Sequence, residues 1–304
     1  MSSPRTFQTL GRGLDHRSPP MVLWRKAKRL GIWDPASIDF DQDRRDWAQL
    51  APLEREVLLH LTALFQAGEE SVTLDLLPLI QVIAAEGRLE EEMYLTSFLW
   101  EEAKHVEAFR RFLDDVVGVE GTGDLARFET PSYRTIFHDA LPTALTRLRE
   151  DASPIAQAEA SVTYNMIVEG VLAETGYHAY EQMLRDHDIL PGMQTVVRHL
   201  KGDESRHMAY GVFLLSRLVA EHGDPVWEAV EHRMNTLLPQ ALGVVQELFA
   251  TYDALPFGLE LDAFLGVAMT QFQRRFQRIE KARDQTLEQV LRLGAETIDP
   301  AHAA

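Results

Sequence analysis

A hydrophobic period of 3.6 residues recurs along this 304-residue chain, in stretches of roughly 25 to 30 residues at a time. The period-2 alternation that is typical of strands is brief and scattered. Helices of about 28 residues are about 40 Å long, and long helices with short connections form antiparallel bundles whose cores can hold sites built from facing side chains. The sequence therefore predicts an all-α fold, organised as a helical bundle.

Proline residues divide the helical pattern into segments. Pro52 opens a long segment, which Pro78 interrupts, so we expect a kink or a break there. Another long segment covers residues 88–117. Ser153 followed by Pro154 is the signal of an N-cap and a first helical residue, and it predicts a helix that continues to about residue 186.

Composition limits the classes of protein that are possible. Hydrophobic residues make up 45% of the chain, and we expect one domain over residues 1–304, with an extended arm over 1–19 and a loose tail over 295–304. The formal net charge of -17 argues against nucleic-acid binding. There are no cysteines, so no disulfide or zinc-thiolate site exists. Because no signal peptide or membrane span is recognisable, we expect a cytoplasmic protein.

Two Glu-x-x-His pairs lie on apolar stripes of the expected helices. They are Glu102 with His105 and Glu204 with His207. Residues three apart share a helix face, and a buried carboxylate or imidazole needs a partner or a metal. The spacing alone is close to chance, so the pairs gain their meaning only from their context.

A lone glutamate on an apolar stripe precedes each pair. Glu69 comes before the first pair and Glu169 before the second. This order indicates an internal duplication of a helical hairpin, in which each half offers two carboxylates and one imidazole. Four carboxylates and two histidines are the ligand set of a dinuclear iron or manganese site in a helical bundle. Without a metal, four buried carboxylates would repel one another.

Other acidic residues near these positions need separate interpretations. Asp203 directly precedes Glu204, where a carboxylate can accept the free N–H of a ligand histidine; the alternative is an ordinary surface residue. Glu70 and Glu101 are adjacent in sequence to ligands, so we expect them to point about 100° away. We expect a solvated face to hold three consecutive glutamates, Glu90, Glu91 and Glu92.

The motifs in their order resemble a known family. GEESVT (68–73), EEAKH (101–105), Tyr164 with Glu169, and DESRH (203–207) resemble the ribonucleotide reductase small subunits, and more closely the R2-like ligand-binding oxidases. The resemblance covers about residues 50–250, and all six ligand positions match. It implies a ferritin-like four-helix bundle core with additional helices, and a homodimer.

The resemblance also implies a chemistry. Members of this family carry a Mn/Fe centre, bind a long-chain fatty acid beside it, and form a tyrosine–valine ether cross-link during O₂ activation; a di-iron centre is the alternative. The manganese-type site would comprise Glu69, Glu102 and His105, with Glu102 bridging. The iron-type site would comprise Glu169, Glu204 and His207.

The cross-linking pair would be Val72, three residues after the first ligand glutamate, and Tyr164, five residues before the third. Five residues place Tyr164 about 140° away from the stripe of Glu169 on a regular α-helix. Tyr164 can reach the metals only if the helix is locally unwound or bulged, as often happens at functional sites. Core packing for Val72 and a helix–helix contact for Tyr164 are the structural alternatives.

Other enzyme classes share this type of bundle. Most reductase small subunits carry a radical tyrosine four residues after the first ligand histidine, where this chain has Phe109, and they end in a peptide with a terminal aromatic, which residues 295–304 lack. A radical-generating reductase subunit, a fatty-acyl desaturase or hydroxylase, and a ferritin-like metal store nevertheless stay open. Several apolar residues would line an acyl channel or simply form core: Phe65, Leu76, Phe98, Phe109 and Met166.

Overall fold

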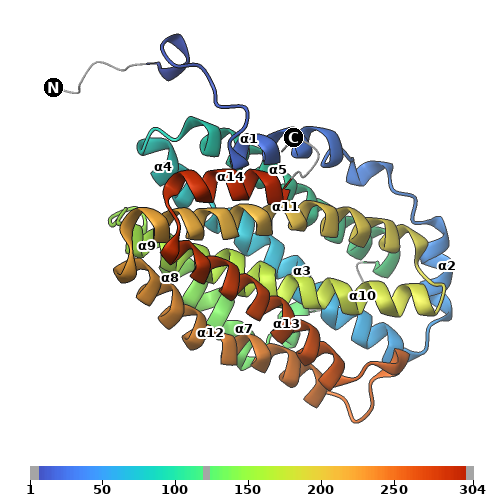
Figure 1. The fold of residues 1–304 in the computed structure, drawn as a ribbon. Coiled ribbons are helices and arrows are strands. Elements are labelled where there is room, and N and C mark those ends of the chain that lie inside the picture. The colour runs from blue at the N-terminus through green and yellow to red at the C-terminus, as the bar shows by residue number, and fades with distance from the viewer. Residues whose placement is uncertain (1–6, 119–123, 299–304) are drawn as a thin grey trace.

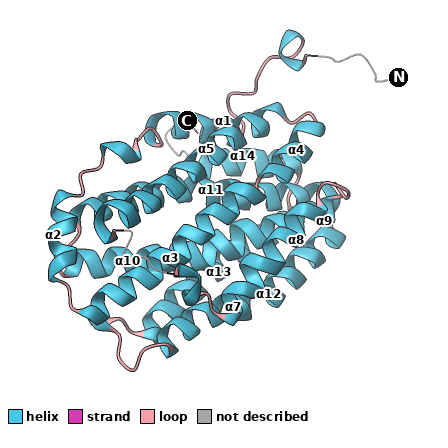
Figure 2. Cartoon of the chain, turned by 180° about the vertical axis from the view of Figure 1, so that it is seen from behind, coloured by secondary structure: helices cyan, strands magenta, loops and turns pink. Residues whose placement is uncertain are grey.

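The computed structural model describes residues 7–118 and 124–298, and within these ranges it contains helices and loops but no strand (Figure 2). The α-helices are α1 (Pro19–Leu30), α2 (Asp41–Gln49), α3 (Pro52–Asp75), α4 (Leu77–Ala85), α5 (Leu89–Phe112), α7 (Pro131–Arg134), α8 (Leu141–Arg147), α9 (Pro154–Ser161), α10 (Glu174–Asp186), α11 (Pro191–His222), α12 (Asp224–Ala250), α13 (Leu261–Glu280) and α14 (Leu287–Ile298). Three π-helical segments are η3 (Leu113–Val117), η5 (Thr135–Ala140) and η6 (Val162–Ala173). The all-α prediction is confirmed.

The boundaries follow the proline and capping signals of the sequence. Pro78 stands in the first turn of α4, and α3 ends just before it, because proline cannot donate the backbone hydrogen bond that a continuous helix needs. The hydroxyl of Ser153 accepts a hydrogen bond from the amide of Ala156 and caps α9. Both sequence predictions are confirmed.

Long helical rods form the centre of the bundle (Figure 1). They are α3, α5, the continuous rod of α9, η6 and α10, and α11. Helix α3 packs against α5, and α11 packs against both η6 and α10. Additional helices cover this centre: α1 lies on α5 and α11, α12 and α13 lie on η6, and α14 crosses α1 and α11. The architecture is that of a ferritin-like bundle with added helices.

The hydrophobic core consists of two clusters, one toward each end of the long helices. On α3, for example, Leu58 belongs to one cluster and Val72 to the other, with Glu69 between them. On α11 the same change occurs between Leu200 and Leu214, which bracket Glu204. The polar positions of the four rods therefore meet in one layer, enclosed by apolar packing at both ends.

The rod from Pro154 to Asp186 is not a regular α-helix. Its central twelve residues, Val162–Ala173, form the π-helical segment η6. A π-helical segment has a wider turn than an α-helix, so side chains change direction relative to the α-helical stripe. The local bulge that Tyr164 required is present, and that prediction is confirmed.

The two ends of the chain were predicted to be extended or loose. Within the described part of the arm, the Arg12 guanidinium binds the carboxylate of Glu90 at 2.8 Å. Helix α14 extends to Ile298 and so includes the first residues of the predicted tail. Residues 1–6 and 299–304 lie outside the described residues. No helix within the described ranges is long and apolar enough to cross a membrane.

Candidate metal centre

The six predicted ligand side chains converge in the central layer of the bundle. Glu69 comes from α3, Glu102 and His105 from α5, Glu169 from η6, and Glu204 and His207 from α11. All six are buried. Residues that lie up to 138 positions apart in the sequence (207 − 69) are thus brought together in one compact cluster.

One group of atoms surrounds Nδ1 of His105. That nitrogen lies 3.3 Å from Oε2 of Glu69, 3.6 Å from Oε2 of Glu102 and 3.5 Å from Oε1 of Glu204. The ligand atoms of these four residues all lie within 4.8 Å of one another. Three carboxylates and one imidazole at such distances can enclose a single cation.

A second group surrounds Nδ1 of His207. That nitrogen lies 3.1 Å from Oε1 of Glu102, 3.6 Å from Oε1 of Glu169 and 3.5 Å from Oε2 of Glu204. The two oxygens of Glu102 therefore face different histidines, which suits the bridging position expected for it. Glu204 also spans both groups, whereas the family resemblance assigned it to the second group alone.

The cluster is chemically incomplete by itself. Five of its buried atoms have no hydrogen-bond partner among the described residues: Oε2 of Glu102, Nδ1 of His105, Oε1 of Glu169, Oε2 of Glu204 and Nδ1 of His207. Buried polar atoms in proteins are rarely left unpaired. These five carboxylate oxygens and imidazole nitrogens can act as metal ligands, and they are directed at the same space. Such a donor set fits iron and manganese.

The pKa values of the ligand carboxylates reflect their burial. Burial raises the pKa of Glu69 to about 8 and raises the pKa values of Glu169 and Glu204. Burial acts in the same direction on Glu102, but the neighbouring imidazoles of His105 and His207 outweigh it and lower its pKa. Protons are thus retained among the carboxylates, and cations that bind there would displace them.

Each histidine uses its other ring nitrogen to contact a carboxylate outside the cluster. Nε2 of His105 lies 3.3 Å from Oδ2 of Asp203, and Nε2 of His207 lies 2.9 Å from Oε2 of Glu101. Such contacts fix the ring orientation and leave Nδ1 free for a metal. The arrangement is reciprocal, because each carboxylate comes from the half of the duplication that does not supply its histidine.

The expectation that Glu101 points away from the site is wrong. Helix α5 is buried on the side next to Glu102 as well, so a rotation of about 100° directs Glu101 toward α11 rather than toward solvent. The sequence contained a usable signal, since Glu101 and Asp203 occupy the same position before the ligand glutamate in EEAKH and DESRH. Glu70 is exposed, as expected.

A network of cations supports these two carboxylates. Nη2 of Arg206 lies 2.6 Å from Oε1 of Glu101 and also binds Asp203. Nζ of Lys104 lies 3.2 Å from Oδ2 of Asp203, and the indole N–H of Trp33 donates to the same oxygen at 2.8 Å. Arg206, Lys104 and both carboxylates are buried, so the network holds Asp203 and Glu101 in place beside the two histidines.

The predicted solvated face of Glu90, Glu91 and Glu92 is corrected in part. Glu91 is buried and lies 3.3 Å from Nε of the buried Arg217, and Glu90 binds Arg12 of the arm. Only Glu92 has no ion pair among these three within the described residues. Sequence alone could not show this, because the partners come from distant segments.

Tyr164 and Val72 meet beside the cluster. The hydroxyl of Tyr164 donates to the carbonyl oxygen of Val72 at 3.2 Å and lies 3.4 Å from Oε1 of Glu102. Both side chains are buried. Burial, followed by the charge of Glu102, raises the pKa of Tyr164 well above its ordinary value, so this phenol keeps its proton.

The contact of Tyr177 with Glu69 was not predicted from the sequence. The hydroxyl of Tyr177, on α10, donates a hydrogen bond to Oε1 of Glu69. The ring of Tyr177 stacks on Phe65 with centroids 4.6 Å apart, and Phe65 stacks on Phe109 at 5.4 Å. No spacing rule connects Tyr177 to Glu69, because the two residues lie on different rods.

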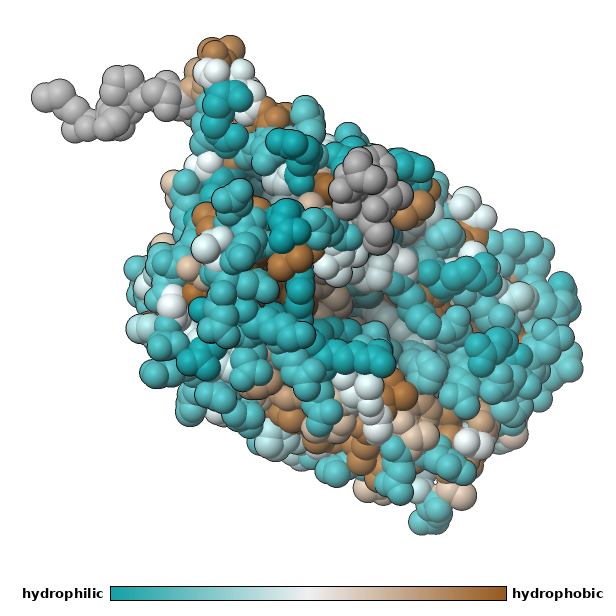
Figure 3. Space-filling model, in the orientation of Figure 1, coloured by the Kyte–Doolittle hydropathy of each residue, from teal (hydrophilic) through white to brown (hydrophobic). Residues whose placement is uncertain are grey.

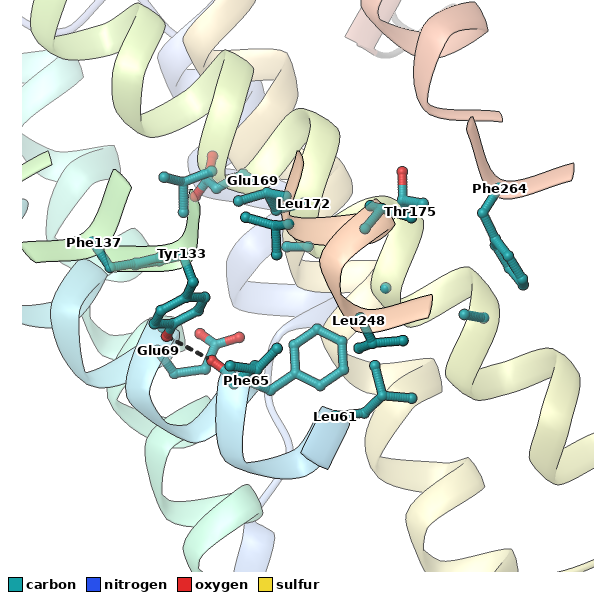
Figure 4. Close-up of a pocket in the computed structure, with 18 of the residues that line it drawn as sticks. Leu61, Phe65, Glu69, Tyr133, Phe137, Glu169, Leu172, Thr175, Leu248 and Phe264 are labelled. Atoms are coloured by element: carbon teal, nitrogen blue, oxygen red, sulfur yellow. Dashed lines mark hydrogen bonds between the residues drawn. The ribbon is translucent and has the colours of Figure 1, made fainter. Parts of the chain in front are cut away.

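A cavity opens beside the cluster (Figure 4). It contains about 920 Å³ of space between side chains, part of it open to solvent. Four ligand carboxylates and Val72 lie at its inner end, while Leu248, Phe249 and Phe264 line the part toward α12 and α13. Tyr133 borders the cavity and donates to the carbonyl oxygen of Leu64 at 2.9 Å (Figure 4).

Only one of the five candidate channel residues lines this cavity. Phe65 does so, whereas the other four belong to the surrounding core: Leu76, Phe98, Phe109 and Met166. Phe98 instead stacks on the imidazole of His207, with ring centroids 3.6 Å apart. The sequence could not separate channel from core because both are apolar and helical.

Comparison with known proteins gives one consistent result. The family model described as ribonucleotide reductase, small chain, matches residues 19–272. An R2-like ligand-binding oxidase from Sulfolobus acidocaldarius is 39% identical, covers 94% of this chain and 98% of its own, and superimposes with a TM-score of 0.85. A variant of an R2-like ligand-binding oxidase with an anaerobically reconstituted Mn/Fe cofactor is 38% identical, covers 91% of this chain and 98% of its own, and has a TM-score of 0.85.

Proposed function

We infer the function from two facts: the chain belongs to the ribonucleotide reductase small-chain family, and it is a homologue of the R2-like ligand-binding oxidases, which are dinuclear metal oxidases. We propose that it is an O₂-activating Mn/Fe oxidase that binds a long-chain fatty acid and forms a Tyr164–Val72 ether cross-link. One observation carries the proposal. A buried cluster of four carboxylates and two imidazoles lies against the hydroxyl of Tyr164 and at the inner end of an apolar cavity.

The two groups of ligand atoms support the assignment of metals that the family resemblance implies. Glu69 and His105 would hold manganese, Glu169, Glu204 and His207 would hold iron, and Glu102 would bridge them. When bound, the metals supply the reduction of O₂. The protein's part is to orient both imidazoles through Asp203 and Glu101, and to hold the ligand layer between two hydrophobic clusters.

The cross-link requires a defined change at two side chains. A bond forms between the phenolic oxygen of Tyr164 and Cβ of Val72, and the O–H and C–H bonds of these atoms break. This is a two-electron oxidation with O₂ as the electron acceptor, and it releases two protons. Glu102 is placed to receive the phenolic proton, since its Oε1 lies 3.4 Å from the hydroxyl.

The cavity supports a fatty acid as the ligand. Its inner end is formed by the carboxylates Glu69, Glu102, Glu169 and Glu204, whose bound metals would attract an anionic head group. Its remaining lining is almost entirely apolar, which suits an acyl chain. We also propose that the protein is a homodimer located in the cytoplasm. A mass measurement on native protein tests the homodimer, and cell fractionation tests the location.

Intact-protein mass after aerobic reconstitution with Mn(II) and Fe(II) tests the cross-link. The expected result is the loss of two hydrogens, mapped to a linked pair of peptides that contain Val72 and Tyr164. Tyr164→Phe should keep its full mass under the same conditions. An unchanged mass in wild-type protein with both metals bound would refute the cross-link. The identity of any bound acyl chain follows from extraction of the same sample and mass spectrometry of the extract.

A further inference from the structure

A second cavity lies beside α11, and none of the six ligand residues lines it. It is enclosed by α11, α13 and α14 and contains about 880 Å³ of space, part of it open to solvent. Ser205, Met208, Val212 and Ser216 of α11 line it, and they share one face of the helix because they are three or four residues apart. Figure 3 shows the molecular surface hollowed on the face where α11, α13 and α14 meet.

The inner wall of this cavity is apolar. Met208 and Phe213 are buried in it, and Val290 of α14 closes the wall opposite them. An apolar wall of this kind favours a hydrocarbon group over water.

The rim carries an unbalanced positive charge. Three arginines of α13 line the cavity: Arg274, Arg275 and Arg278. Arg275 is paired with Glu174 and also donates to the carbonyl oxygen of Gly170. The other two have no ion pair within residues 7–118 and 124–298, and Nη2 of Arg278 contacts only Oγ1 of Thr297, at 3.4 Å.

No Asp or Glu stands among the described residues that line the cavity. This is unusual for a chain whose net charge is -17. Guanidinium groups form their strongest hydrogen bonds with carboxylates and other oxyanions. Two arginines beside an apolar wall therefore match a molecule with an anionic head and a hydrocarbon tail.

We propose that the cavity between α11, α13 and α14 binds an amphiphilic carboxylate, such as an acyl chain of medium length. The carboxylate pairs with Arg274 and Arg278, and the tail lies against Met208, Phe213 and Val290. This site is separate from the cavity beside Glu69, and its existence does not depend on the function proposed for the metal centre.

A photoreactive decanoate with a diazirine at the end of its chain tests this site on the full, metal-loaded chain. After irradiation and digestion with trypsin, the expected label lies in the peptide of residues 207–217, which contains Met208 and Phe213. Label in peptides that contain Phe65 or Leu248 reports the cavity at the metal centre instead. The two sites, and the failure of either one, are therefore distinguished in one experiment.

Charge variants test whether the arginines at the rim bind the carboxylate of the probe. Arg274→Gln and the double variant with Arg278→Gln should reduce the label in residues 207–217 at least tenfold. Arg283→Gln is the matched control, because Arg283 pairs with Asp224 at 3.0 Å outside the cavity, and it should leave the label unchanged. The single Arg274→Gln variant removes an exposed side chain without an ion pair, so its folding is not at risk.

Three results would overturn the proposal. They are the absence of label in residues 207–217 at millimolar probe, equal label in Arg274→Gln and wild-type protein, and equal label from the corresponding uncharged alcohol probe. Unlabelled decanoate should compete with the probe at this peptide, whereas acetate, which has the head group without the tail, should not.

Discussion

Oε2 of Glu101 lies 2.9 Å from Nε2 of His207, so a carboxylate beside the first Glu-x-x-His pair supports the histidine of the second. Asp203 serves His105 in the reverse direction at 3.3 Å. The two halves of the duplicated hairpin are therefore interlocked, and neither can form its histidine site alone.

Glu101→Gln should selectively weaken the metal position at His207. An amide supports the imidazole less well than a carboxylate, and losses of this kind cost about 10- to 100-fold in metal affinity. Competition titrations that follow iron and manganese separately would measure the effect. Glu70→Gln is the matched control, because Glu70 is an exposed neighbour of a ligand on α3. Equal affinities in Glu101→Gln and Glu70→Gln would show that the contact has no such role.

Gly31→Ala should displace the side chain of Glu101, which supports His207. A Cβ atom at Gly31 would lie 2.1 Å from Oε1 of Glu101 and 2.8 Å from Nη2 of Arg206. Overpacking of this kind typically costs about 1–3 kcal/mol, which urea unfolding would detect. Gly202→Ala is the control, since nothing lies within 4 Å of a Cβ there, and alanine in a helix should stabilise by about 0.5–1 kcal/mol. Stability unchanged by Gly31→Ala would mean that the layer is not tightly packed.

His60 should make the protein sensitive to mild acid. Burial lowers the pKa of His60 to about 4, below the value of about 6.5 in an unfolded chain. The unfolded state binds the proton first, so stability is fully present above pH 6.5 and is lost as the pH falls toward 4, by up to about 3 kcal/mol. Urea unfolding of wild type and His60→Gln at several pH values should show a smaller acid loss in the variant. His222→Gln, which changes an exposed histidine, should retain the wild-type slope; equal slopes in all three proteins would contradict the assignment to His60.

Val245→Trp should shorten the ligand cavity of the metal centre. Val245 is half-buried on α12 and lines that cavity, so a larger ring would occupy its volume. We expect binding of long acyl chains to weaken roughly tenfold, about 1.4 kcal/mol, while short chains bind as before, as measured by calorimetry. Leu242→Trp is the control on the same helix, because Leu242 does not line the cavity. Equal weakening for all chain lengths would exclude this placement of the acyl chain.

The sequence was most informative where a pattern is local. Helix boundaries at Pro78 and Ser153 and the need for a bulge at Tyr164 follow from positions along one helix. The ligand residues follow from the repeated order of a lone glutamate and a Glu-x-x-His pair. Other contacts between rods could not be predicted: the hydrogen bond from Tyr177 to Glu69 and the burial of Glu91 each depend on which helix packs opposite. The boundary between channel and core was also inaccessible, since apolar residues serve both.

Anomalous diffraction from crystals of the reconstituted protein, recorded at the manganese and iron absorption edges, tests the central claim most directly. The account predicts two metal positions in the layer, with manganese next to Nδ1 of His105 and Glu69, iron next to Nδ1 of His207 and Glu169, and Glu102 between them. A single metal position, or two positions away from these side chains, would contradict it.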